Sequence, residues 1–292
     1  MAQEPYLGRS VFNPMDRKFV EQLFKAHQEC PECPSPQRVA EFFQDLLATL
    51  FPDIHKFPHT NVKEFELHMQ KLLLRLEQIL TRNPQAAGTQ AEMVANSFFE
   101  QLPGLRQALM NDAEAMYEGD PAAKTVKEVI RTYPGFFAVG AYRIAHALHK
   151  LGVQLIPRMI TEYAHSKTGI DIHPGADIGS HFCIDHGTGV VIGETTKIGD
   201  HVKVYQGVTL GALSVDKEDA DAKRHPTIES HVVIYAGATI LGGKTTVGAN
   251  SIIGGNVWLT RSVAPNTKIY YQSKMHNADT DEMDVVIIRE QS

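Results

Sequence analysis

Residues 170–193 read Ile-Asp-Ile-His-Pro-Gly-Ala-Asp-Ile-Gly-Ser-His-Phe-Cys-Ile-Asp-His-Gly-Thr-Gly-Val-Val-Ile-Gly, and within them an aliphatic residue returns every six positions. A period of six fits neither an amphipathic helix, with a period of about 3.6, nor an alternating strand, with a period of about 2. It is typical of a parallel β-helix, in which the aliphatic side chain points inward and glycine relieves strain at the turns. The repeat shifts register twice and is interrupted once. Its aliphatic positions are Ile172, Ile178, Ile184, Val190, Ile192, Ile198, Val204, Leu210, Ile228, Ile234, Ile240, Leu241, Val247, Ile253 and Leu259.

The repeat defines the domain organisation. It begins near Gly169 and ends near Pro265, and at about 18 residues per coil it predicts about four or five coils. Residues 212–224 break the period and predict a loop that leaves the coil; such a polar excursion is usually functional or disordered, and its return into Arg224-His225-Pro226 favours a functional one. We therefore predict a helical domain over 1–168, a β-helix over 169–267 with an excursion loop at 212–224, and a C-terminal tail over 268–292.

The N-terminal half has a helical rather than a hexapeptide pattern. Apolar residues such as Phe19, Val20, Leu23 and Phe24 recur at helical spacing, and prolines punctuate the segment. This predicts a helical bundle, so the fold class is α+β: an all-helical domain followed by a parallel β-helix. In the tail, an acidic turn precedes a short strand near residues 285–288.

Composition narrows the classes of function. The chain has 292 residues, 43% of them hydrophobic, with a formal charge of −6, so no basic surface for nucleic acid is expected. Its first residues lack the pattern of a signal peptide, and no apolar run approaches the ~18 residues of a membrane span. We expect a soluble cytoplasmic protein. Cys30 and Cys33 form a Cys-x-x-Cys pair without a second pair, so no metal is expected there, and Cys183 is predicted to be a small buried hydrophobe.

Two histidines stand in unusual settings within the repeat. His186 lies in Asp185-His-Gly-Thr-Gly189, and His225 follows Arg224 where the excursion ends. A neutral imidazole is a suitable general base near neutral pH, provided that a partner such as a carboxylate holds its other ring nitrogen. The spacing also leaves open a zinc site between subunits, as in the β-helical carbonic anhydrases. Its ligands would come from His181, His186, His201, His225 and His231.

Several motifs in the same order resemble the serine O-acetyltransferase family over roughly residues 112–265. The specific ones are Ile184-Asp-His-Gly-Thr-Gly189 and Lys223-Arg-His-Pro226. The resemblance implies a left-handed β-helix trimer, with acetyl-CoA in the groove between adjacent subunits and L-serine at its inner end. Further matches are Asp120-Pro121, Ala141-Tyr-Arg-Ile-Ala-His146, Asp171-Ile-His-Pro174, Ile192-Gly-Glu194 and Gly207-Val-Thr-Leu-Gly211.

The resemblance also implies roles for individual residues. His186 is the expected general base, which takes the proton of the serine hydroxyl, and Asp171 is expected to orient it. Asp120 and Asp185 would face the substrate ammonium group. Arg224 would bind the carboxylate through its planar fork, and His225 would complete the amino-acid pocket.

The resemblance implies that five residues contact the co-substrate acetyl-CoA. A backbone N–H near Gly211 would stabilise the developing oxyanion. The small residues Ala236 and Gly237 would let the pantetheine lie close to the coil, and Lys244 or Arg261 would meet the 3′-phosphate. No metal is expected.

Three departures from the family pattern limit the transfer of its properties. The chain reads Gly211-Ala-Leu-Ser214 where the family has Gly-Gly-Thr, Ile269-Tyr-Tyr-Gln-Ser-Lys274 where a Gly-x-Pro-Ala-Arg motif is common, and ends in Gln-Ser rather than isoleucine. Because family members use that isoleucine to bind the sulfhydrylase, we expect no such complex by that route. Three other functions stay open: an acetyltransferase for another acceptor, such as a sugar or homoserine, a trimeric zinc lyase, and a scaffold without catalytic activity. The trimers could also pair into a dimer of trimers.

Overall fold

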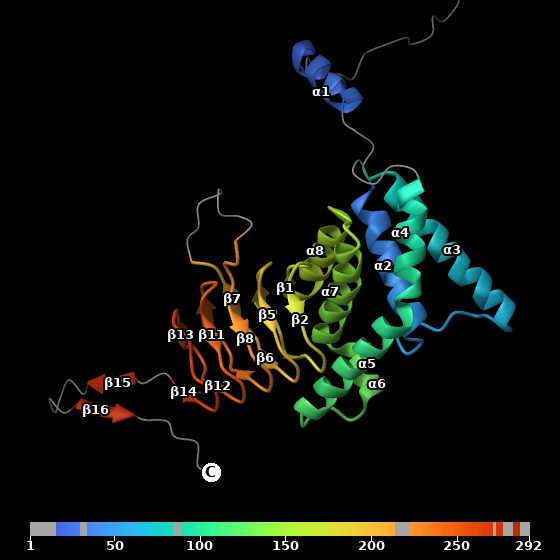
Figure 1. Ribbon diagram of the computed structural model, residues 1–292. Helices are drawn as coiled ribbons and strands as arrows, with labels where there is room; N and C mark the ends of the chain where they lie inside the picture. The colour runs from blue at the N-terminus through green and yellow to red at the C-terminus, as the bar shows by residue number, and fades with distance from the viewer. Residues whose placement is uncertain are drawn as a thin grey trace, which may run out of the picture.

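The computed structural model describes residues 16–29, 34–83, 89–213 and 222–270, and the backbone of 273–276 and 283–286. Within these residues, a helical N-terminal part is followed by a parallel β-solenoid, as Figure 1 shows. This confirms the predicted fold class. Cys30, Cys33 and most of the loop 212–224 lie outside the described residues.

Eight helices make up the described N-terminal part, and α8 ends at Thr168, where Gly169 adopts a left-handed φ of 70°. Apolar residues of α2, α7 and α8 pack into a core that continues into the β-helix. In α1, by contrast, no residue is buried, so Phe19, Val20 and Leu23 expose the predicted apolar face. No helix in the described part of the chain is long and apolar enough to cross a membrane. The helices are α1 (Arg17–Glu29), α2 (Pro36–Leu50), α3 (Val62–Thr81), α4 (Thr89–Glu100), α5 (Leu102–Gly119), α6 (Val126–Thr132), α7 (Pro134–Lys150) and α8 (Ile156–Thr168).

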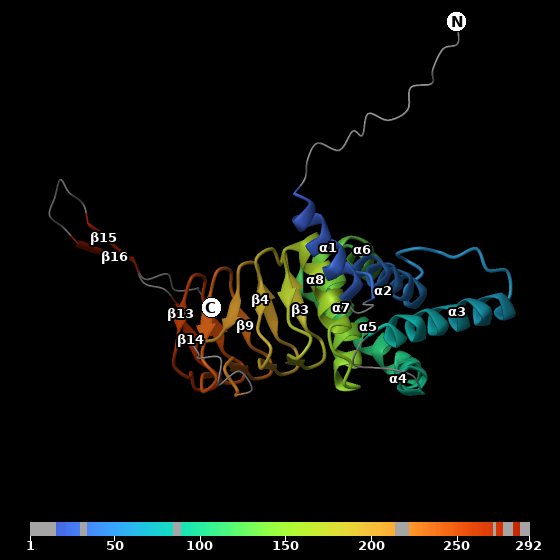
Figure 2. The ribbon, with the colours of Figure 1, turned by 90° about the horizontal axis from the view of Figure 1, so that it is seen from above.

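The β-helix has three flat faces, each a parallel sheet built from every third strand up to β13; β14 then pairs with β12. We name them face A (β1, β4, β7, β10, β13), face B (β2, β5, β8, β11) and face C (β3, β6, β9, β12, β14). The chain passes from A to B to C and back to A, and the views in Figures 1 and 2 show the coils stacked in one column. The strands are β1 (Asp171–Ile172), β2 (Asp177–Ile178), β3 (Cys183–Asp185), β4 (Val191–Ile192), β5 (Lys197–Ile198), β6 (Lys203–Tyr205), β7 (Thr209–Gly211), β8 (Thr227–Ile228), β9 (Val233–Ile234), β10 (Thr239–Leu241), β11 (Thr246–Val247), β12 (Ile252–Ile253), β13 (Trp258–Leu259), β14 (Lys268–Ile269), β15 (Ser273–His276) and β16 (Met283–Val286).

The hexapeptide positions line the interior of the coil. Ile172, Ile178 and Ile184 are buried, one on each face of the first coil. The prediction is wrong at Leu241, because Ile240 takes the inward position on β10 and Leu241 points outward, toward Gly211. The parallel ladder also continues to Lys268 and Ile269, two residues past the predicted boundary, since β14 pairs with β12. Beyond it, β15 and β16 form an antiparallel pair, with β16 beginning at Met283, slightly before the predicted strand.

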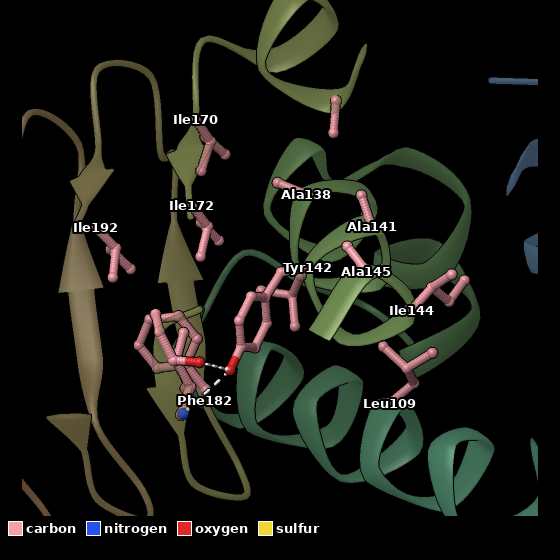
Figure 3. Close-up of a cluster of buried hydrophobic side chains, with 14 of the residues drawn as sticks. Leu109, Ala138, Ala141, Tyr142, Ile144, Ala145, Ile170, Ile172, Phe182 and Ile192 are labelled. Carbon is pink, nitrogen blue, oxygen red and sulfur yellow. Dashed lines mark hydrogen bonds between the residues drawn. The ribbon is translucent and has the colours of Figure 1, made fainter. Parts of the chain in front are cut away.

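The helical part covers the open edge of the first coil, and polar side chains bind its backbone. The Tyr142 hydroxyl donates to the Ala176 carbonyl (2.7 Å) and accepts from the Ile178 N–H (3.1 Å). Figure 3 shows this side chain reaching from α7 toward the coil beside Phe182. Arg143 donates to the carbonyls of Ile178 and Gly179, and His146 Nδ1 bonds to the Pro174 carbonyl. The first coil is thereby fixed to α7.

Histidines form a column at the corner between faces B and C. His181, His201 and His231 have left-handed φ values of 58°, 56° and 61° and occupy equivalent turns of successive coils. Their rings stack, with centroids 4.3 Å and 4.9 Å apart. The column continues in Asn250 and Asn266, which share this φ; asparagine, like histidine, tolerates the left-handed region better than most residues.

Candidate active site

The corner between faces C and A, called here the C–A corner, brings together three of the residues predicted from the sequence. Asp185 ends β3, His186 follows it directly, and Asp120 approaches from the end of α5 in the helical part. Asp120 lies close enough to Lys203 and His186 to interact with both electrostatically. The helical part therefore contributes directly to this corner.

The backbone at His186 holds its imidazole out from the coil. His186 has a φ of 57°, and its side chain is 76% exposed. Gly187 follows with a φ of 86°, and a Cβ there would lie 2.5 Å from Ile170 Cδ1, so only glycine lets the turn close over the core. The same left-handed φ recurs at the turns of the B–C corner, so it is a property of the turns of the coil, and histidine tolerates it.

Asp120 is held by a tyrosine that the sequence analysis did not identify. The Tyr133 hydroxyl donates to Asp120 Oδ2 at 2.5 Å, and the Ala122 N–H donates to Oδ1 at 2.8 Å. The hydrogen bond from Tyr133 lowers the pKa of Asp120, and the same bond raises the pKa of Tyr133 to about 12. Asp120 is therefore a fixed carboxylate at neutral pH, and Tyr133 stays protonated.

Asp185 is paired with Lys203, a second residue that was missed. Lys203 Nζ lies 2.8 Å from Asp185 Oδ2, while the other oxygen, Oδ1, lies 3.8 Å from His186 Nε2. Both Asp185 and Lys203 are largely buried. The one feature of the sequence that could have indicated this pair is the hexapeptide register, which places Lys203 on the outer side of β6, one coil after β3.

Asp171 does not contact His186 in this structure. Its carboxylate lies 3.5 Å from Arg158 Nη1, and Arg158 also pairs with Glu162 on α8. The orienting role expected for Asp171 therefore stays a prediction, and the only carboxylate that the described residues place within 4 Å of the His186 ring is that of Asp185.

Arg224 and His225 lie at a different corner, between faces A and B. Both precede β8, where the chain returns from loop 212–224 to the coil. Arg224 Nη2 pairs with the carboxylate of Glu194, from the same corner one coil earlier. Face A separates this A–B corner from His186, so one chain presents the predicted site as two groups of residues.

His225 is a neutral hydrogen-bond donor. Its Nδ1 accepts from the Thr195 N–H at 3.1 Å, and the Thr195 hydroxyl lies 2.9 Å from the same nitrogen. The proton of the ring is therefore on Nε2. Burial, reinforced by the positive charge of Arg224, lowers the pKa of His225 to about 4. A Cβ on Gly193 would lie 2.0 Å from His225 Cδ2, so glycine is needed for the ring to pack here.

The residues predicted to contact acetyl-CoA divide between the same two corners. Gly211, Lys244 and Arg261 belong to the A–B corner, and both cations are exposed. Ala236 and Gly237 belong to the C–A corner. Gly237 has a φ of 72°, so the turn by itself accounts for a glycine at this position.

The histidines of the zinc alternative lie at three corners. His181, His201 and His231 stack face to face at the B–C corner, so their lone pairs run side by side rather than converging on one ion. Within the described residues, the one group with metal-ligand spacing is Glu162, His165 and Asp171, and Arg158 pairs with both of its carboxylates.

Comparisons with known proteins agree on one family. Residues 36–141 match the model of the serine acetyltransferase N-terminal region. A plasmid-borne serine acetyltransferase of Synechococcus elongatus is 52% identical over 185 residues, which cover 62% of this chain and 58% of that protein. This chain thus spans less than two thirds of that relative. A Helicobacter pylori serine acetyltransferase is 51% identical over 123 residues, 42% of this chain and 70% of the relative.

The solved structures extend the similarity to most of the fold. Serine acetyltransferase isoform 3 of Entamoeba histolytica, crystallised with cysteine, matches with a TM-score of 0.72 and 35% identity. The match covers 88% of this chain and 92% of that one, so it includes both the helices and the β-helix. The chain therefore belongs to the serine acetyltransferase family.

Proposed function

We propose that the protein is a serine O-acetyltransferase, which transfers the acetyl group of acetyl-CoA to the hydroxyl of L-serine in a single ternary complex. The observation that carries the proposal is the meeting of Asp120, from the helical part, with Asp185 and His186 at the C–A corner. It supplies a base and carboxylates for an amino-acid acceptor in one place. Family membership and the cysteine bound by the Entamoeba relative support the same acceptor class, since cysteine differs from serine by sulfur for oxygen.

In the proposed reaction, His186 acts as the general base. Its imidazole takes the proton of the serine hydroxyl as that oxygen attacks the thioester carbonyl, so a carbon–oxygen bond forms. When the carbon–sulfur bond breaks, the same imidazole returns the proton to the CoA sulfur. No covalent enzyme intermediate is needed, because the two substrates are held together. The exposed position of His186 suits this role, as both substrates can reach it.

The amino-acid pocket is proposed to draw on both corners. Asp120, a fixed carboxylate, would bind the substrate ammonium group, with Asp185 beside it. Arg224 would bind the carboxylate, and the Nε2–H of His225 would donate a hydrogen bond. Since face A separates these pairs within one chain, the pocket would close where the A–B corner of one subunit meets the C–A corner of the next, as expected of a trimer. The expected roles of Asp171, Ala236, Gly237, Gly211, Lys244 and Arg261 belong to the same proposal.

Acetyl transfer can be tested by measuring CoA release with a thiol reagent. With acetyl-CoA, we expect turnover with L-serine in preference to homoserine or a sugar. Replacing His186 by alanine should lower kcat by about two to four orders of magnitude. His201→Ala is the matched control, because His201 has almost the same φ, 56°, at an exposed turn of the next coil, away from the proposed site.

The outcomes separate the alternatives. Near-normal turnover of His186→Ala would exclude this histidine as the base. Preferred acetylation of a sugar would keep the fold family but change the substrate. About one zinc per chain, with activity lost to a chelator, would favour the lyase instead.

A further inference from the structure

We infer that Lys203 is a positioning residue for the proposed acetyl transfer: it locks the carboxylate of Asp185 beside His186 and holds the segment that bears Asp120. This inference rests on the proposed function and adds a residue to it. Lys203 lies on β6, one coil away from Asp185 and 83 residues after Asp120 in the sequence.

Three groups fix the Lys203 ammonium. Its Nζ lies 2.8 Å from Asp185 Oδ2, donates to the Gly119 carbonyl at 2.6 Å and lies 4.3 Å from the centre of the Tyr205 ring. These are a carboxylate, the C-terminal end of α5 and an aromatic face, each of which attracts a cation. The Lys203 side chain is only 16% exposed, so these contacts are poorly screened by solvent. Burial alone would lower the pKa of Lys203, but its hydrogen bonds, above all that with Asp185, raise it.

The bond to Gly119 places Asp120. Gly119 is the last residue of α5, and Asp120 follows it directly. A Cβ on Gly119 would lie 3.0 Å from Cys183 Sγ, so the end of α5 lies directly against β3. Lys203 therefore ties α5, β3 and β6 at one point, and this junction sets the distance between Asp120 and His186.

The bond to Asp185 determines the charge that His186 faces. Among the described residues, the charged groups recorded beside this imidazole are Asp185 from β3 and Asp120 from the end of α5, and Lys203 from β6 pairs with Asp185. Because Lys203 neutralises Asp185, the net charge beside the base is that of Asp120 alone. Without Lys203, the charge of Asp185 would no longer be neutralised, so two negative charges would face the imidazole and its protonated form would become more stable. An imidazolium cannot accept the serine proton, so Lys203 would keep the base available at lower pH.

The experiment compares four proteins: wild type, Lys203→Met, Lys203→Arg and the control Lys268→Met. Lys268 lies in the same outward column of face C, since Lys203 pairs with Val233, Val233 with Ile252 and Ile252 with Lys268. It is exposed and has no ion pair within the described residues. The readouts are the pH profile of kcat/KM, the separate KM values for serine and acetyl-CoA, and the thermal midpoint.

For Lys203→Met, we expect the acid limb of kcat/KM to move up by at least about half a pH unit, an effect reduced by the exposure of His186. The KM for serine should rise about tenfold, since Asp120 is no longer held, while the KM for acetyl-CoA changes little. Lys203→Arg should restore the acid limb, because it keeps the charge, and Lys268→Met should match the wild type.

An acid limb and a serine KM unchanged in Lys203→Met would overturn the inference. The inference would also be overturned if Lys203→Met had lower activity and a lower thermal midpoint but an unchanged pH profile. That result is expected if Lys203 only stabilises the fold. Absence of acetyl transfer in the wild type would instead refute the proposed function, so the two failures are distinguishable.

Discussion

Replacing Asp112 by alanine should destabilise the fold by about 3–5 kcal/mol, because it breaks a buried ion pair between α5 and α7 whose two members also bind the backbone of the first coil. The Asp112 side chain is fully buried and accepts from Arg143 Nε at 2.7 Å and Nη2 at 2.9 Å, and from the Phe182 N–H at 2.9 Å. Truncation leaves the Phe182 N–H unpaired, at about 1–3 kcal/mol, and removes two charge-assisted bonds of about 1.5–3 kcal/mol each. The Ile178 and Gly179 carbonyls still accept from Arg143, so the buried guanidinium keeps two partners, which limits the loss.

The matched control is Asp45→Ala. Asp45 also pairs with an arginine on another helix, Arg75, at 2.6 Å, but the two side chains are 44% and 42% exposed. Its loss should therefore cost less than about 1 kcal/mol. Urea unfolding followed by circular dichroism measures both changes, and in thermal melts Asp112→Ala should lower the midpoint by about 10 °C. Similar losses in the two variants would refute the reasoning that burial decides the strength of these pairs.

Two further predictions concern the candidate site. Tyr133→Phe removes the hydrogen bond that holds Asp120, so the KM for serine should rise about threefold to tenfold with little change in kcat; a change in kcat alone would contradict a binding role for Asp120. The pKa of His225 is lowered from 6.5 to about 4, so its contribution to stability is complete above pH 6.5 and is lost as the pH falls through 4. From pH 7.5 to pH 5, wild type should therefore lose about 1–2 kcal/mol per chain more than His225→Asn in urea unfolding, and equal losses would refute this.

The hexapeptide period predicted the β-helix because inward positions in a solenoid repeat regardless of what surrounds the coil. Ile172, Ile178 and Ile184 are buried on three faces as the period requires. The period fails at Leu241, because the inward residues Ile240 and Val247 are seven positions apart, so a period of six fits Leu241 rather than its buried neighbour Ile240. Sequence periodicity alone does not decide between these two residues.

The candidate site could be predicted only where its residues fall within motifs. Asp185, His186, Arg224 and His225 interrupt or flank the repeat, which made them visible. Lys203 and Tyr133 lie in ordinary surroundings, and their importance depends on contacts that only the fold creates, with the Gly119 carbonyl and with Asp120. Likewise, the pairing of Asp171 with Arg158 follows from how α8 enters the first coil.

The binding of the first coil by α5 and α7 has a consequence for self-association. A solenoid that simply stops exposes a rim of unpaired peptide groups, which is a template for the next coil of another molecule. Here side chains of Asp112, Tyr142, Arg143 and His146 occupy that rim, so no strand can add to it. The helical part thus caps the solenoid and prevents end-to-end polymerisation. A shortened chain that began at Gly169 would lose this protection.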